Sequence, residues 1–191
     1  MIRYLLVLSL ILVLASCGEE VTMPKPRDYF RIDLPEKSYQ VYESDCPYSF
    51  EYPVYSRIEN IAESGGEKCR ANIDFGKLHA KIHLTYKDLN NNVGTYLEDS
   101  RKLSYKHAVK ASAIDEYVIS APQRNVYGLI YEVGGNTASA IQFHVTDSTK
   151  HFLRGSLYFY ASPNADSLAP VVSFLTKDIE HLIETFEWKA K

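Results

Sequence analysis

The chain opens with a short apolar leader that ends at a cysteine, and this leader fixes where a folded domain can begin. The run from Tyr4 to Ala15 is almost entirely hydrophobic and follows a single positive charge at Arg3. As a helix the run would reach about 18 Å, well short of the roughly 30 Å hydrocarbon core of a bilayer. The length therefore favours a cleaved secretory signal over a membrane span.

The residues around the cysteine have the pattern of a bacterial lipobox. In Leu14-Ala15-Ser16-Cys17, a branched residue and two small residues precede the cysteine. The Cys17 thiol can accept diacylglycerol, and cleavage before Cys17 frees an amine that can carry a further chain such as palmitate. Because each buried CH2 contributes about 0.8 kcal/mol, two or three chains hold a protein on a membrane. We expect a signal peptide over residues 1–16 and lipid on Cys17; an uncleaved anchor with an incidental cysteine is the alternative.

Residues 17–35 are expected to form an extended tether, and residues 36–191 a single domain. Pro24 and Pro26 lock φ and restrict the residues before them, which keeps the tether extended. A chain of the remaining length can bury one core. Loss of Arg3 with the leader shifts the formal net charge by one unit, from −3 to −4. So mild an acidity, without a dense Lys/Arg block, does not indicate nucleic-acid binding.

Once Cys17 carries lipid, two cysteines remain, Cys46 and Cys69. An even number outside the cytoplasm favours a disulfide, which would stabilise the fold by about 3 kcal/mol. Two free buried thiols are the alternative. A cysteine-based metal site is not favoured, because the chain has no CxxC spacing.

Alternating apolar and polar residues from Tyr39 onward predict a sheet. On the clearest strand, alternate residues share one buried face: Leu78, Ala80, Ile82, Leu84 and Tyr86. Further strands are predicted over residues 48–52, 69–75, 114–120, 126–133, 138–146 and 152–161. Turns are predicted at 64–67, 134–136 and 147–150, where glycine, asparagine, aspartate and serine gather.

Two amphipathic helices are predicted. The first covers about Val93–Lys110 after capping asparagines at 90–92, and its stripe is Val93, Tyr96, Leu97, Ser100, Ser104, His107 and Ala108. The second is capped by Ser167, with Pro170 in its first turn, and its stripe is Leu168, Val171, Val172, Leu175, Ile179, Leu182, Ile183 and Phe186. This order indicates an α+β domain, a mainly antiparallel sheet flanked by two helices. It is similar to the Mog1/PsbP-like sandwich.

Motifs that carry chemistry are scarce. His79 and His83 have the HxxxH spacing of a helical metal pair, but on the predicted strand they lie about 13 Å apart, too far for one ion. The sequence contains no GxSxG, GxGxxG or GxxxxGK motif. We therefore expect no enzymatic activity, no metal and no cofactor. An envelope hydrolase acting on glycan or peptide, or a carrier of a hydrophobic molecule, is the rival hypothesis.

Two segments are candidates for protein binding. Tyr29, Phe30 and Arg31 follow the tether, and aromatic and arginine residues are enriched where proteins bind one another. The alternative is that this segment lies against the domain with its apolar residues buried. The second candidate is a basic face on the first helix, formed by Arg101, Lys102 and Lys106. An ordinary solvated face is the alternative there.

Several segments of this chain resemble the gliding-motility lipoprotein GldD family of Bacteroidetes. They are the lipobox at 14–17, Pro24–Arg27, Tyr29–Pro35, Cys46–Pro53 and Tyr96–Leu103. The resemblance covers essentially the whole chain, with Asp28 where glycine is expected.

The resemblance implies a cell-envelope lipoprotein required for gliding motility. It would support the gliding machinery and the coupled type IX secretion system as a non-enzymatic assembly or interaction factor. Its partners would be the membrane, reached through lipid on Cys17, and proteins of that machinery. The acidic Gly18-Glu19-Glu20 resembles an export signal to the outer membrane; the periplasmic and surface faces both stay open. The resemblance implies no catalytic residues and no cofactor.

Overall fold

The computed structural model describes residues 32–61, 68–106, 111–160 and 164–189. Several predictions fall outside these residues. They concern the signal peptide, the lipid on Cys17, the tether up to residue 31, the contact residues Tyr29, Phe30 and Arg31, and the turn at 64–67. Residues Asp33–Lys191 form one compact unit.

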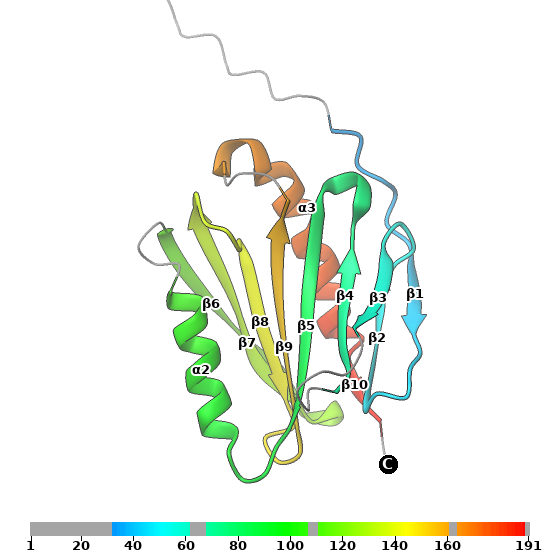
Figure 1. The fold of residues 1–191 in the computed structure, drawn as a ribbon, viewed down its shortest axis with the longest axis vertical. Coiled ribbons are helices and arrows are strands. Elements are labelled where there is room, and N and C mark those ends of the chain that lie inside the picture. The colour runs from blue at the N-terminus through cyan, green and yellow to red at the C-terminus, as the bar shows by residue number, and fades with distance from the viewer. Residues whose placement is uncertain (1–31, 62–67, 107–110, 161–163, 190–191) are drawn as a thin grey trace, which may run out of the picture. The chain divides into compact units, whose positions relative to one another are not determined.

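The main element is a seven-stranded antiparallel sheet in the order β3-β4-β5-β9-β8-β7-β6 (Figure 1). Its strands are β3 (Arg57–Ile61), β4 (Arg70–Asp74), β5 (Ala80–Asp88), β6 (Ala111–Ala121), β7 (Val126–Gly135), β8 (Ile141–Thr146) and β9 (His151–Phe159). Each neighbouring pair is antiparallel. β3 and β6 are therefore the two edges of the sheet.

A smaller sheet is built from chain ends that are far apart in sequence. It has the order β1-β2-β10, with β1 at Tyr39–Tyr42, β2 at Tyr48–Pro53 and β10 at Glu187–Trp188. Short 3-10 helices lie at Gly76–Leu78 (η1) and Pro122–Arg124 (η2). The sequence pattern did not predict β3 or β10. β10 has only two residues, and its pairing with β2 comes from tertiary packing.

Helix α3 (Ala165–Glu184) supplies the core on one face of the main sheet (Figure 1). Its buried apolar residues are Val171, Leu175, Ile179, Leu182 and Ile183. They pack with the strand residues of that face, among them Phe143 and Leu157, in one cluster. Most of the predicted stripe is therefore confirmed.

The predicted cap of α3 is wrong. The helix begins at Ala165, and the Asn164 side chain accepts a hydrogen bond from the Ser167 amide at 3.3 Å. Ser167 is therefore inside the first turn, and Pro170 lies in the helix interior. The error has a physical cause: asparagine caps as well as serine does, and the sequence offers both within one turn.

Helix α2 (Val93–Tyr105) lies against the opposite face of the sheet from α3. Its only buried residues are Ser100 and Ser104, while Leu97 of the predicted stripe is exposed. The predicted stripe is thus only partly confirmed. Asn92 takes the N-cap position, but its side chain binds the Asn90 amide instead of the helix. Lys106 ends the described helix, and 107–110 lie outside the described residues.

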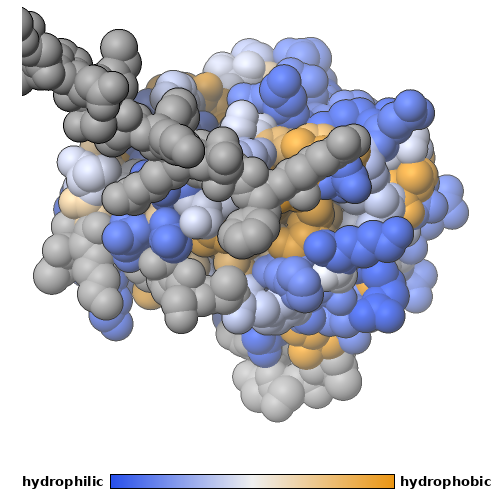
Figure 2. All heavy atoms as spheres, turned by 90° about the horizontal axis from the view of Figure 1, so that it is seen from above, coloured by the Kyte–Doolittle hydropathy of each residue, from blue (hydrophilic) through white to orange (hydrophobic). Residues whose placement is uncertain are grey.

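The α+β class, with an antiparallel sheet between two helices, is confirmed. In the inner strand β8 all six residues are buried. They are buried on both sides because a helix covers each face of the sheet. The predicted strand that began at Leu78 starts later in the structure. Leu78 belongs to η1, and His79, with φ of 49°, separates η1 from β5. On the face seen in Figure 2, hydrophobic residues lie among hydrophilic ones.

Candidate functional site

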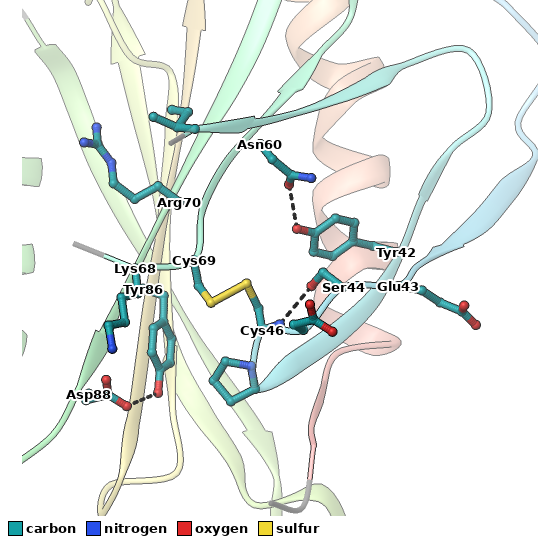
Figure 3. A pocket seen from close by; sticks show the side chains of 13 residues that line it. Tyr42, Glu43, Ser44, Cys46, Asn60, Lys68, Cys69, Arg70, Tyr86 and Asp88 are labelled. Carbon is teal, nitrogen blue, oxygen red and sulfur yellow. Dashed lines mark hydrogen bonds between the residues drawn. A yellow bond between two sulfur atoms is a disulfide. The ribbon is translucent and has the colours of Figure 1, made fainter. Parts of the chain in front are cut away.

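An open recess lies beside the disulfide, between the β1–β2 connection and the strands β3, β4 and β5 (Figure 3). Its volume is about 690 Å³. The structure pairs Cys46 with Cys69 across it, with 5.5 Å between the two Cα atoms. Cys46 lies in the connection between β1 and β2, and Cys69 lies directly before β4, so the disulfide fastens the small sheet to the main one.

Two tyrosines reinforce the walls of this recess. The Tyr48 hydroxyl donates to the backbone carbonyl of Cys69 at 2.9 Å, and the Tyr42 hydroxyl donates to Asn60 Oδ1 at 2.9 Å. Tyr48 is fully buried, and burial raises its pKa, so it remains a neutral donor. The Tyr42 bond joins the small sheet to β3, and the Tyr48 bond joins it to the residue directly before β4. The recess is therefore a preformed feature with fixed walls.

A third tyrosine forms one side of the recess. The Tyr86 hydroxyl lies 2.7 Å from Asp88 Oδ1 and 2.7 Å from His151 Nδ1. Because a hydroxyl has one proton, which Asp88 accepts, His151 Nδ1 donates to the phenolic oxygen. Burial, followed by the hydrogen bond to Asp88, raises the pKa of Tyr86. A phenol with a raised pKa is a poor nucleophile and a poor base at neutral pH. The arrangement joins β5 to β9 as a structural bridge.

The rim of the recess carries charges of both signs. Glu43, Asp45 and Asp88 are acidic, and Lys68 and Arg70 are basic. Figure 3 places Lys68 and Asp88 on the β4–β5 side of the disulfide, across from Tyr42 and Glu43. An open, charged recess with aromatic walls suits a polar protein segment better than an apolar small molecule.

A Ser–His pair lies beneath α2, on the other face of the sheet. Ser100 Oγ is 3.3 Å from His144 Nδ1, and Ser104 Oγ donates to Gln142 Oε1 at 3.3 Å. Both members of the Ser–His pair are 2% exposed. Burial, and then the charge of Arg154, lowers the pKa of His144 to about 4. A base this weak and this deeply buried is poorly suited to activate a serine at neutral pH.

The basic residues predicted on the first helix are exposed, but two of them are partly neutralised. Arg101 Nε lies 3.3 Å and Lys102 Nζ 3.6 Å from Glu98. Arg101 also lies over the Tyr105 ring, 5.4 Å from its centroid. Lys106 follows at the C-terminal end of α2. Glu98 therefore neutralises part of the positive charge of Arg101 and Lys102.

The histidines that share HxxxH spacing do not come together. His79 sits in the turn before β5, and His83 on β5 donates a hydrogen bond from Nδ1 to Asn72 Oδ1 at 2.8 Å. Among the described residues, no group of three or more His, Cys, Asp or Glu side chains is arranged to hold a metal ion. Neither of the two described helices combines the length and apolar character of a membrane span.

Sequence reasoning missed the tyrosine bridges and the buried Asp178 on α3. Asp178 accepts hydrogen bonds from Lys37 Nζ and from the hydroxyls of Tyr39 and Tyr55. An acid in the middle of an otherwise apolar stripe was the one available signal. Its partners lie more than 120 residues away along the chain, so spacing could not identify them.

Comparisons with known proteins agree with the sequence resemblance. A family model described as "Gliding motility lipoprotein GldD" matches residues 19–188. No curated protein matches the sequence. Among solved structures, the chain is similar to the solution structure of cyanobacterial PsbP (CyanoP) from Synechocystis sp. PCC 6803. That likeness has 12% identity and a TM-score of 0.48, and it covers 83% of this chain and 97% of the other.

Proposed function

The chain belongs to the gliding motility lipoprotein GldD family, and we propose that it is a lipid-anchored interaction factor of the gliding machinery. Membership associates the protein with gliding motility and with a membrane-anchored place in the cell envelope. The finer proposal is that it supports the gliding apparatus and the coupled type IX secretion system by binding their proteins, without catalysis.

The recess beside the disulfide is the observation that carries the binding role. Its walls are held by a covalent bond and by the hydroxyls of Tyr42 and Tyr48, and its rim is charged. A site that is rigid before binding loses little conformational entropy when a partner docks. Lipid on Cys17 would confine the domain to a membrane and raise its effective concentration near envelope partners. Residues 17–35 would act as the tether, with the outer membrane as the proposed location.

The predicted contact residues remain part of the proposal. Tyr29, Phe30 and Arg31 lie outside the described residues and are proposed as a contact segment close to the membrane anchor. The cations Arg101, Lys102 and Lys106 are proposed as a second, weaker surface, because Glu98 competes for two of them.

The rival functions fit the observed groups less well. A hydrolase would use the Ser100–His144 pair, which is buried and whose histidine is a weak base. A carrier of hydrophobic molecules would use the hollow of about 400 Å³ between α3 and β6–β8. That hollow is lined by charged residues as well as apolar ones: Asp115, Glu132, Lys177 and Glu180. Charged walls disfavour an apolar ligand.

A complementation experiment tests the proposal. In a gliding bacterium, deletion of the gene is expected to abolish spreading on agar, and the wild-type chain to restore it. Lys68→Glu reverses a charge on the recess rim and is expected to reduce spreading at normal protein level. Lys77→Glu is the matched control, because Lys77 is an exposed lysine in η1, outside the recess. Normal spreading of the deletion strain would contradict the gliding role; wild-type behaviour of Lys68→Glu would remove the recess as the contact.

A further inference from the structure

Strand β6 is a long edge strand of the main sheet. It runs over eleven residues and pairs with β7, and no described strand lies on its other side. Its register with β7 is continuous from Ile114 to Ala121, after a shift between Ala111 and Ile114. We call Ile114–Ala121 the β6 edge. An exposed edge of this kind presents backbone donors and acceptors that can pair with another strand.

The backbone groups that face outward follow from the ladder. The Val133 amide donates to the Ala140 carbonyl, so Val133 points toward β8 and away from β6. Val133 opposes Ile114, and hydrogen-bonded and non-bonded pairs alternate along antiparallel strands. The residues of β6 that turn their N–H and C=O outward are therefore Ile114, Glu116, Val118 and Ser120. Those between them, such as Tyr117, are bonded to β7.

Side chains on the β6 edge combine apolar and acidic character. Val118 is 79% exposed and Tyr117 is 50% exposed, on opposite faces of the strand. Asp115 and Glu116 are exposed beside them. On the Tyr117 side, the negative charge of Glu132 raises the pKa of the phenol, as burial and Asp115 also do. The β6 edge therefore exposes apolar side chains that a partner could cover, and it carries negative charge.

We propose that the β6 edge binds an extended segment of a partner protein in which pairs of apolar residues alternate with pairs of Lys or Arg, so that each face of the segment carries both kinds of side chain. The segment adds a strand beside β6. Its backbone bonds to the outward groups of Glu116 and Val118, its apolar side chains cover Val118 and Tyr117, and its cations face Asp115 and Glu116. Strand addition of this kind takes affinity from the main chain and specificity from alternate side chains.

Charge complementarity favours a basic partner segment over a second copy of this chain. A second copy of the chain would bring its own Asp115 and Glu116 to the edge, and like charges across a strand pair are destabilising. A basic segment instead gains from each opposite-charge pair. The proposal rests on the binding role proposed above, but it concerns a different surface from the recess.

Hydrogen exchange on the mature lipoprotein in detergent tests the proposal. The probe is an extended peptide in which pairs of valines alternate with pairs of lysines, and the control is the same peptide with glutamate for lysine. The lysine peptide is expected to slow exchange at the outward amides of Ile114, Glu116, Val118 and Ser120. It should bind at least about tenfold more tightly than the glutamate peptide, since several charge pairs differ.

Two variants of one residue separate backbone pairing from other effects. Val118→Pro removes an outward N–H without removing a bond to β7, and should weaken binding about fivefold to tenfold. Val118→Thr keeps that N–H and a β-branched side chain, and is expected to bind like the wild type. Should Val118→Pro unfold the protein, Glu116→Lys takes its place. This variant leaves Asp115 to oppose the new lysine, so the preference between the two peptides should be lost.

Three results would overturn the proposal. One is that the protein binds both peptides equally well, or binds neither of them. Another is binding without slower exchange at the outward amides. The third is concentration-dependent protection of those amides in the peptide-free protein, which would assign the edge to a second copy. None of these readouts measures spreading on agar, so failure here is distinguishable from failure of the gliding role.

Discussion

Lys37 Nζ lies 2.6 Å from Asp178 Oδ1, so the first segment of the domain is joined to the middle of α3. The same ammonium donates to the Phe174 carbonyl at 2.8 Å and lies 3.4 Å from the centroid of the Phe174 ring. Asp178 is 2% exposed, and Tyr39 and Tyr55 also donate to it, at 3.0 and 2.5 Å. Both oxygens of a carboxylate buried in an apolar face thereby have a hydrogen-bond donor.

Replacement of Asp178 is expected to destabilise the fold more than replacement of Lys37. Asp178→Ala leaves an ammonium and two half-buried hydroxyls without their acceptor, and should lower the free energy of unfolding by about 2–4 kcal/mol. Lys37→Met leaves the carboxylate with two tyrosine donors and should cost about 1–2 kcal/mol. Urea unfolding of both variants measures the difference. Equal losses would show that the tyrosines do not support the carboxylate.

Stability is expected to fall as the pH drops from about 6.5 to about 4, because of His144. Burial lowers the pKa of this histidine to about 4 from its ordinary value of 6.5. The unfolded chain therefore binds more protons in this window, and stability is complete above it and lost on acidification. The shift corresponds to about 3 kcal/mol.

His144→Gln is expected to remove most of this slope, measured as the unfolding free energy at pH 7 and pH 4.5. His83→Gln is the matched control. Burial also lowers the pKa of His83, but its side chain is more exposed, so the variant should keep most of the slope. A slope that survives in His144→Gln would mean that other groups govern the acid sensitivity.

Reduction of the disulfide is expected to lower stability by about 3 kcal/mol, in line with its loop of 23 residues. Because Tyr48 still binds the Cys69 carbonyl, the protein should remain folded at room temperature. Thermal unfolding with and without reductant measures the effect, and Cys46→Ser/Cys69→Ser should reproduce the reduced form. An unchanged melting temperature would contradict the role of the bond in holding the recess.

Tyr86→Phe tests whether the Tyr86 hydroxyl in the recess has a structural role or a catalytic one. Loss of the hydroxyl removes the bonds to Asp88 and His151 and should cost about 1–2 kcal/mol. Spreading of a complemented strain should remain normal, since a binding role does not need the phenol. Lost spreading at a normal protein level would instead indicate that the hydroxyl takes part in chemistry, and would favour the enzyme hypothesis.

Local patterns predicted most of the fold. The alternation along β5 and the apolar stripe of α3 were readable because each depends on one buried face with a fixed period. The Asp147 turn was equally local: its Oδ1 accepts bonds from the amides of Thr149, Lys150 and His151. The buried face of α2 was harder to predict, because its buried residues are serines. A helix that packs through polar side chains shows only a weak repeat of hydrophobic residues in its sequence.

The lipobox at Cys17, the two remaining cysteines and the α+β order could be read from the amino-acid sequence, because each depends on neighbouring residues. The folded structure was needed to show that Cys46 faces Cys69, that Tyr86 contacts His151 and that Asp178 binds Lys37. It also decided that β6 is an edge. These relationships join residues distant in sequence, and the position of one strand beside another leaves no periodic trace in either segment.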